Sequence, residues 1–200
     1  MGFSAHNDNL PATEQAAILA DYGRRVARKI DQDIWTGDGT TGNFDGLIPA
    51  FILDGDVIDV GTPLTISAAN VEAEVGRWLD LIPDSLFGSD GFIYGVSTDV
   101  IRALRRAYGT QARSNGTFIN ANEFDFEGTV LTEIKGLPAS HMVAYNPALV
   151  FFGTGLLSDM NEVKIKDMDE SDLSGQIRFK LVMTGGVQYA FGGEIILYGV

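Results

Sequence analysis

Residues 13–39 read TEQAAILADYGRRVARKIDQDIWTGDG. Apolar side chains recur at every fourth position of this stretch, at Ile18, Tyr22, Val26, Ile30 and Ile34. This spacing places them along one side of an α-helix, so we predict one long helix from about Thr13 to Trp35. Thr13 is its candidate N-cap residue. The apolar stripe is narrow, which indicates a helix that lies across a surface and is covered on one side only.

The glycine-rich segment 37–42 reads GDGTTG and ends this helix. It matches the pattern G-x-G-x-x-G, which binds a dinucleotide when a strand precedes it and a helix follows it. Here a helix precedes it, and we predict an irregular segment around Phe44–Pro49 after it. The sequence therefore favours a turn over a nucleotide site.

The rest of the chain predicts a mixture of helices and strands. Apolar periodicity indicates helices over Ala69–Leu81 and from Ser97 or Thr98 to Tyr108, with a buried strand, Gly91–Val96, between them. Further strands are predicted at Asp56–Val60, Thr129–Glu133, Met142–Tyr145, Val163–Lys166, Gln176–Phe191 and Ile195–Tyr198, with a bulge or bend at Gly185-Gly186 inside the Gln176–Phe191 strand. Because Ile195–Tyr198 is apolar on both faces, we expect it inside a sheet. The predicted fold class is α+β.

Composition excludes several classes of protein. The chain has 200 residues, 45% of them apolar, so it can bury a substantial core, and it has no cysteine for a disulfide or a thiol nucleophile. A net charge of −13 argues against sequence-specific nucleic-acid binding and against an anionic membrane as partner. The first residues, MGFSAHND, lack the basic and apolar regions of a signal peptide.

Acidic residues form two candidate sites. Asp167, Asp169, Glu170 and Asp172 could offer oxygen ligands to Ca²⁺, but they lack the order of an EF-hand loop, and a solvated hairpin loop is the favoured interpretation. Asp31, Asp33 and Asp38 lie near the C-terminus of the long helix, which disfavours anions, and we expect them to be exposed to solvent.

The remaining candidates for chemistry are isolated. His6 and His141 are the only two histidines, and His141, between Ser140 and Met142, is interpreted as structural and not as a catalytic base for Ser140. Asn115-Gly116-Thr117 matches a glycosylation sequon but is interpreted as a turn. We assign no catalytic, cofactor-binding or metal-ligating residue and no cofactor.

The order of these elements resembles that of tailed-bacteriophage major capsid proteins. Asp33–Gly39 followed by Phe44–Leu47 resembles the end of that family's spine helix. Gly91–Val96 with the helix to Tyr108 looks like the central strand and helix of its axial domain, and Gly136-Leu137-Pro138 resembles its usual Gly-Leu-Pro. Gln176–Gly199 looks like its long peripheral strand and the return into the axial sheet.

The resemblance implies the Hong Kong ninety-seven-type capsid fold. Its peripheral domain, with the spine helix and long antiparallel strands, would comprise residues 1–60 and 157–190. Its axial domain, a central sheet flanked by helices, would comprise residues 61–156 and 191–200. Only about twelve residues precede the long helix, so we expect the family's N-terminal arm and extended loop to be missing. The covalent cross-links that some members of the family form through that loop are therefore not expected in this chain.

The function implied by this resemblance is that of a non-enzymatic shell protein. Copies would assemble through hexamers and pentamers into an icosahedral shell around double-stranded DNA, with scaffold, portal and decoration proteins as further partners. The protein would reside in the virion, and in the host cytoplasm before assembly. Without the arm and loop, we expect this chain alone to be a monomer or small oligomer.

Two alternatives stay open at this point. An encapsulin-like compartment protein would share the fold and enclose enzyme cargo. An unrelated α+β enzyme would use a metal held by Asp38, Asp45 or the acidic run 167–172.

The strand predicted at Gln176–Phe191 can be tested by mutation. If Ile177, Phe179 and Leu181 face the long helix, Phe179→Ala should cost about 3 to 5 kcal/mol through the cavity it leaves. Arg178→Ala, on the opposite face, should cost less than about 1 kcal/mol. Chemical denaturation of both variants measures the difference, and equal costs would contradict the alternation.

Overall fold

The computed structural model describes residues 12–40, 43–110, 123–154, 163–167, 177–181 and 185–199. The chain divides into two compact units, each built from two segments. The first unit consists of Met1–Ile30 and Gly153–Gly186, and the second of Asp31–Phe152 and Val187–Val200. Each unit therefore forms only when two segments that are distant in the sequence pack together.

The long helix is confirmed as α1, Ala12–Thr36. Tyr22, Val26 and Ile30 are half-buried while the residues between them are exposed, which confirms the narrow apolar stripe. The N-cap prediction was wrong: the helix already includes Ala12, so Thr13 lies inside its first turn and not at the boundary.

Two antiparallel strands form the sheet of the first unit. β7 (Val163–Asp167) pairs with β8 (Ile177–Leu181), with Val163 opposite Leu181 and Asp167 opposite Ile177. The strand predicted over 176–191, with a bulge or bend at Gly185-Gly186, is found as two strands, β8 and β9 (Gly185–Tyr189), and β9 begins at that glycine pair. The directions of the side chains of β8 lie outside what the structure describes, so the prediction for Phe179 stays a prediction.

β9 pairs with β6 (Val150–Thr154) in a second two-stranded sheet. β6 was not predicted from the sequence. Val150, Phe151 and Phe152 are consecutive apolar residues without the alternation that reveals a strand with one buried face.

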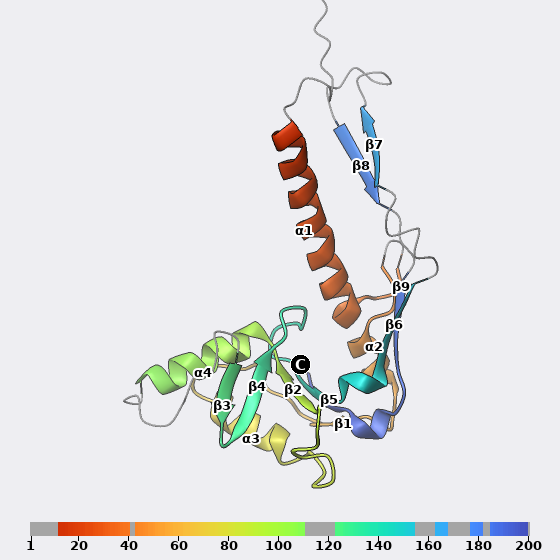
Figure 1. Ribbon diagram of the computed structural model, residues 1–200. Helices are drawn as coiled ribbons and strands as arrows, with labels where there is room; N and C mark the ends of the chain where they lie inside the picture. Colours follow the sequence, from red (N-terminus) through yellow and green to blue (C-terminus); the bar gives the residue numbers. More distant parts are fainter. Residues whose placement is uncertain are drawn as a thin grey trace, which may run out of the picture. The chain divides into compact units, whose positions relative to one another are not determined.

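A six-stranded mixed sheet forms the centre of the second unit (Figure 1). Its strand order is β1-β10-β5-β2-β4-β3. The strands are β1 (Ile58–Asp59), β2 (Ile93–Val96), β3 (Glu123–Phe126), β4 (Thr129–Glu133), β5 (Met142–Tyr145) and β10 (Ile196–Tyr198). β10 lies between β1 and β5, which confirms that the apolar segment 195–198 is inside a sheet.

Helices α3 (Val71–Leu79) and α4 (Thr98–Thr110) cover one face of this sheet. Both helices were predicted, and Val71, Trp78 and Leu104 are fully buried as expected. They pack against side chains at alternate positions of the strands, which point to that face, among them Leu131 and Ile196. This cluster is the larger of two cores.

The opposite face of the sheet carries the second core. Val143 and Leu197 pack with Trp35 and with α2 (Leu47–Leu53). Their neighbours along the strands, such as Met142 and Ile196, belong to the first core, because successive side chains of a strand point to opposite faces. The irregular segment predicted around Phe44–Pro49 was wrong, because α2 begins at Leu47. Pro49 is tolerated there because it occupies the first turn, where the missing N–H group has no intrahelical partner to lose.

Two short 3₁₀ helices, η2 (Pro147–Leu149) and η4 (Gly192–Glu194), complete the described elements. Among the described residues, none of the helices combines the length and the apolar character that crossing a membrane requires.

Neighbouring residues of β4 test the assignment of the two faces. Leu131 is fully buried in the first core, whereas Val130 is 41% exposed on the other face. Leu131→Ala should therefore lower the free energy of unfolding by about 2 to 5 kcal/mol. Val130→Ala should cost less than about 1 kcal/mol. Urea denaturation measures both, and a larger cost at Val130 would mean that the register of β4 is wrong.

Candidate functional site: polar clusters and exposed apolar surface

The loop after α1 is tied together by one carboxylate. Oδ1 of Asp38 accepts hydrogen bonds from the Thr40 hydroxyl (2.7 Å), the Thr40 N–H (3.2 Å) and the Asn43 amide (3.1 Å). The Thr40 side chain and then the Asn43 side chain contribute most to lowering the pKa of Asp38 to about 2. A backbone bridge between Asp38 and Asp45 closes the loop.

The glycines of this loop are explained by the loop itself. A Cβ atom on Gly37 would collide with the carbonyl oxygen of Phe44, and one on Gly39 would collide with the Asp45 carboxylate. Gly39 also has a φ of +66°, which favours glycine. The segment 37–40 is a turn between two helices, and it lacks the preceding strand of a dinucleotide site.

The acidic candidates are placed apart. Asp31 is exposed as expected, but Asp33 is buried, so the expectation of exposure was wrong for that residue. It lies in the last turns of α1, where Trp35 also enters the core. Asp167 ends β7, and the rest of the run 167–172 lies outside the described residues. Within the described ranges, the structure brings together no group of three His, Asp or Glu residues able to hold a metal ion.

Ser140 and His141 lie buried beside the first turn of α4. The Ser140 N–H donates to Oδ2 of Asp99 (2.8 Å), and its hydroxyl accepts from the Ile66 N–H (3.0 Å). Nδ1 of His141 is 2.8 Å from the Ala139 carbonyl oxygen, and Gly199 packs against its ring. These contacts hold a turn and a loop in place. His6 and the sequon 115–117 lie outside the described residues.

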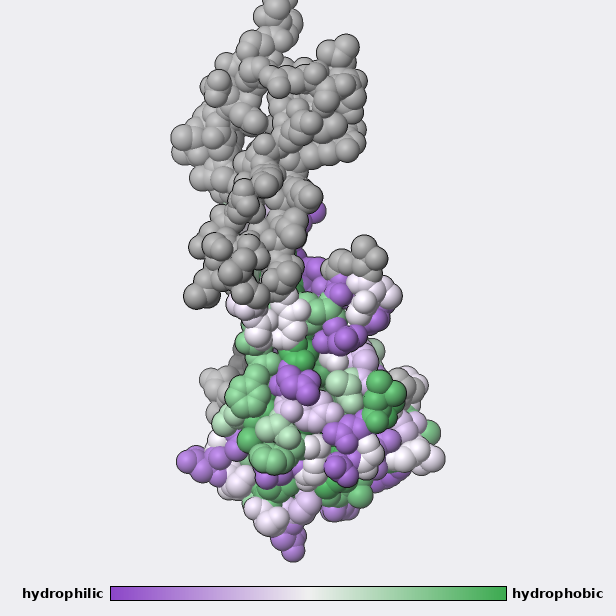
Figure 2. Space-filling model, turned by 90° about the vertical axis from the view of Figure 1, so that its right-hand side faces the viewer, coloured by the Kyte–Doolittle hydropathy of each residue, from purple (hydrophilic) through white to green (hydrophobic). Residues whose placement is uncertain are grey.

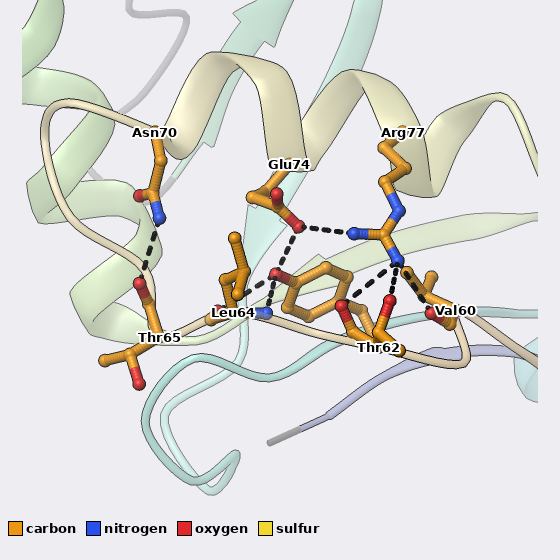
Figure 3. Close-up of polar contacts among 8 residues, drawn as sticks. Val60, Thr62, Leu64, Thr65, Asn70, Glu74 and Arg77 are labelled. Carbon is orange, nitrogen blue, oxygen red and sulfur yellow. Dashed lines mark hydrogen bonds and ion pairs between the residues drawn. The ribbon is translucent and has the colours of Figure 1, made fainter.

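A buried charged cluster on α3 was missed by the sequence analysis (Figure 3). Oε2 of Glu74 accepts a hydrogen bond from the Tyr198 hydroxyl (2.6 Å) and forms an ion pair with Arg77 (3.4 Å). Arg77 also donates to the carbonyl oxygens of Val60 (2.9 Å) and Thr62 (3.1 Å). The sequence held one indication of this cluster: Glu74 lies next to the apolar Val75, and Arg77 follows three positions later, at the spacing of an ion pair on a helix.

This cluster fastens the loop before α3 to the last strand of the sheet. The Tyr198 hydroxyl accepts a hydrogen bond from the Leu64 N–H (2.8 Å), so one side chain joins β10, α3 and the loop. Burial, and then the hydrogen bond to Glu74, raise the pKa of Tyr198 to about 12. The arrangement is structural, since Glu74, Arg77 and Tyr198 direct these hydrogen bonds to groups within the fold.

Several large apolar side chains remain exposed on the second unit. Leu53 is 87% exposed, Ile52 69% and Phe191 61%. Figure 2 views the side on which α2, β6 and β9 lie and shows apolar and hydrophilic areas next to each other on the described part. An open apolar groove of about 330 Å³ lies elsewhere on this unit, lined by Phe87, Phe92, Tyr94 and Val130 among others. Exposed apolar residues are typical of sites of protein association or ligand binding where they form one contiguous patch.

Tyr198→Phe tests the buried cluster. Removing the hydroxyl leaves Glu74 and the Leu64 N–H without this partner, so the variant should lose about 1 to 3 kcal/mol at neutral pH. Because the folded-state pKa lies above the ordinary value of 10.0, the hydroxyl stabilises the fold fully below pH 10. The difference from Tyr198→Phe should then shrink as the pH rises from 10.0 to about 12.

Denaturation curves across that pH range measure the effect. Tyr145→Phe, at a half-buried tyrosine outside this cluster, is the control and should cost less than about 1 kcal/mol at neutral pH. A constant difference for Tyr198→Phe at all pH values would contradict the role assigned to its hydroxyl.

Comparison with solved structures identifies similar folds, whereas no protein-family model and no curated protein sequence matches the chain. A chain of the satellite phage P4 procapsid that includes the size determination (Sid) protein matches with a TM-score of 0.56 and 10% identity, covering 92% of this chain and 66% of that one. The capsid of an empty GTA particle matches with a TM-score of 0.55 and 13% identity, covering 92% of this chain and 64% of that one.

This chain thus spans somewhat less than two thirds of the length of either capsid chain, at 66% and 64%. At identities of 10% and 13%, the likeness concerns the fold. The chain itself combines the long α1, strands paired from distant parts of the sequence and a mixed sheet with its helices, which is an α+β arrangement. The chain has the fold of phage capsid proteins.

Proposed function

We propose that this chain is the major capsid protein of a tailed phage or prophage, a structural subunit that self-assembles into an icosahedral shell around double-stranded DNA. One observation carries the proposal: 92% of the chain aligns with the capsid chains of two different shells. A match over nearly the whole chain means that both compact units, and not one common substructure, take part in the likeness.

The domain division of a capsid subunit is part of this proposal. The peripheral domain would comprise residues 1–60 and 157–190, and the axial domain residues 61–156 and 191–200. The two compact units support this scheme in one respect: like the two proposed domains, each unit combines an earlier segment of the chain with a later one. Strands β2, β3, β4, β5 and β10 of the six-stranded sheet, with α3 and α4, would form the core of the axial domain, whereas β1 belongs to the range of the peripheral domain.

The proposed partners are first of all other copies of this chain, in hexamers and pentamers, and then scaffold, portal and decoration proteins. The exposed apolar residues of the second unit support self-association, since such groups are stabilised when they are covered. The proposed location is the virion, and the host cytoplasm before assembly. The role requires no catalytic residue and no cofactor.

Isolation of particles tests the proposal. The gene is expressed together with its natural neighbouring genes, and the lysate is fractionated on a density gradient. We expect particles tens of nanometres across in which this chain is the most abundant polypeptide by mass spectrometry. Cryo-electron microscopy should show the six-stranded sheet repeated throughout the shell. Particles that lack the chain, or that contain only a few copies of it, would refute the proposed role.

A further inference from the structure

The surface at the end of α2 combines exposed apolar side chains with carboxylates. We call it the α2 patch: Ile52, Leu53 and Phe191, with Asp56, Asp59 and Glu194. Phe191 directly precedes Gly192, and a Cβ on Gly192 would lie 2.5 Å from Oδ2 of Asp54 and 3.2 Å from Cβ of Asp56. The chain after β9 therefore lies next to the chain after α2, and β1, which bears Asp59, contacts η4.

The outer side of α4 has the opposite character. Arg102, Arg105 and Arg106 are exposed and follow the i, i+3, i+4 spacing of one helix face, which we call the α4 stripe. Ile101, Ala103 and Leu104 between them are buried. Asp99, in the first turn, is bonded to Ser97 and Ser140.

The two surfaces lie on different sides of the same sheet. α2 packs on the face that carries Val143 and Leu197, whereas α4 packs on the other face. α4 also reaches the edge strand β3, where the rings of Tyr108 and Phe124 are 5.2 Å apart, while the α2 patch adjoins β1 at the opposite edge (Figure 1). The α2 patch and the α4 stripe of one chain therefore face away from each other.

We infer that the α2 patch of one copy binds the α4 stripe of the next copy, head to tail. This inference rests on the proposed function and names the contact that function needs. Opposite charges make the surfaces complementary, and the exposed ring of Phe191 can also accept a guanidinium group. Because each copy carries a net charge of −13, a local basic surface such as the α4 stripe lowers the repulsion between copies; Arg105 and Arg106 of this stripe also interact within their own chain.

The direction of this contact fits a closed assembly. Two different patches of one chain form a heterologous contact, which repeats from copy to copy and closes into a ring when the rotation between copies allows it. A contact of the α2 patch with itself would instead place like charges opposite each other, which disfavours a two-fold dimer through this surface.

Charge reversal tests the contact in the full chain. One variant carries Asp56→Arg and Asp59→Arg, and the other Arg102→Glu and Arg106→Glu. Sedimentation velocity from micromolar to millimolar concentration should show each variant associating at least about tenfold more weakly than the unaltered chain, because like charges now meet. An equimolar mixture of the two variants should associate again, and so should a chain with all four substitutions.

Matched controls place equal charge changes elsewhere. Asp80→Arg with Asp84→Arg, on exposed positions after α3, and Arg24→Glu with Arg25→Glu, on α1, should leave association within about twofold of the unaltered chain, since neither pair lies on the two surfaces. Thermal unfolding verifies that every variant folds. If a reversal prevents folding, the neutral pairs Asp56→Asn with Asp59→Asn and Arg102→Gln with Arg106→Gln replace it and should weaken association in the same direction.

Several results would overturn the inference. The first is that the unaltered chain stays monomeric. The second is that either charge-reversed variant associates as strongly as the unaltered chain. The third is that an equimolar mixture of the two variants does not associate. Loss of binding to a double-stranded DNA oligonucleotide by Arg102→Glu with Arg106→Glu, with association unchanged, would assign the α4 stripe to nucleic acid instead. Particles that still form with either reversal would refute this contact and leave the shell role intact. If mixing the two variants restores association but the chain never enters particles, the shell role alone would be refuted.

Discussion

The packing of Trp35 into the second core is the contact on which the rest of the second unit depends. Trp35 is buried at the end of α1, its ring lies 5.8 Å from that of Tyr145 in an edge-to-face arrangement, and Gly136 passes directly beside it. A Cβ on Gly136 would lie 2.5 Å from the Asp31 carbonyl oxygen and 2.6 Å from Cδ1 of Trp35. The end of α1 is thereby fixed against the sheet, which sets where the following loop begins.

From that point the chain is guided by a series of close backbone contacts. Gly37 and Gly46 approach so closely that their backbones share a 2.8 Å hydrogen bond, and Asp38 holds the residues between them. α2 can then lay Leu47, Ile48 and Phe51 on the sheet while it leaves Ile52 and Leu53 outside. An amphipathic helix of 7 residues thus contributes both to the core and to the exposed surface.

The sequence predicted most of the regular elements because their apolar residues follow a clear period. The helices α1, α3 and α4 show this, whereas β10 was predicted as a short segment that is apolar on both faces. The order of the elements along the chain was enough to indicate the capsid fold. α2 was missed because a proline in its first turn looked like a break, and β6 because its apolar residues are consecutive. The pairing of Glu74 with Tyr198 joins residues 124 positions apart, which no local pattern reveals.

The position of β10 also governs when this unit can form during synthesis. Ile196 lies opposite both Ile58 and Ala144, so the strand between β1 and β5 is supplied by one of the most distant parts of the chain. Until residue 198 has left the ribosome, β1 lacks its partner in the sheet and β5 has an open edge. Such distant pairing slows folding relative to local contacts. A chain that ends before β10 therefore lacks the strand that joins β1 to β5, and its sheet stays unfinished.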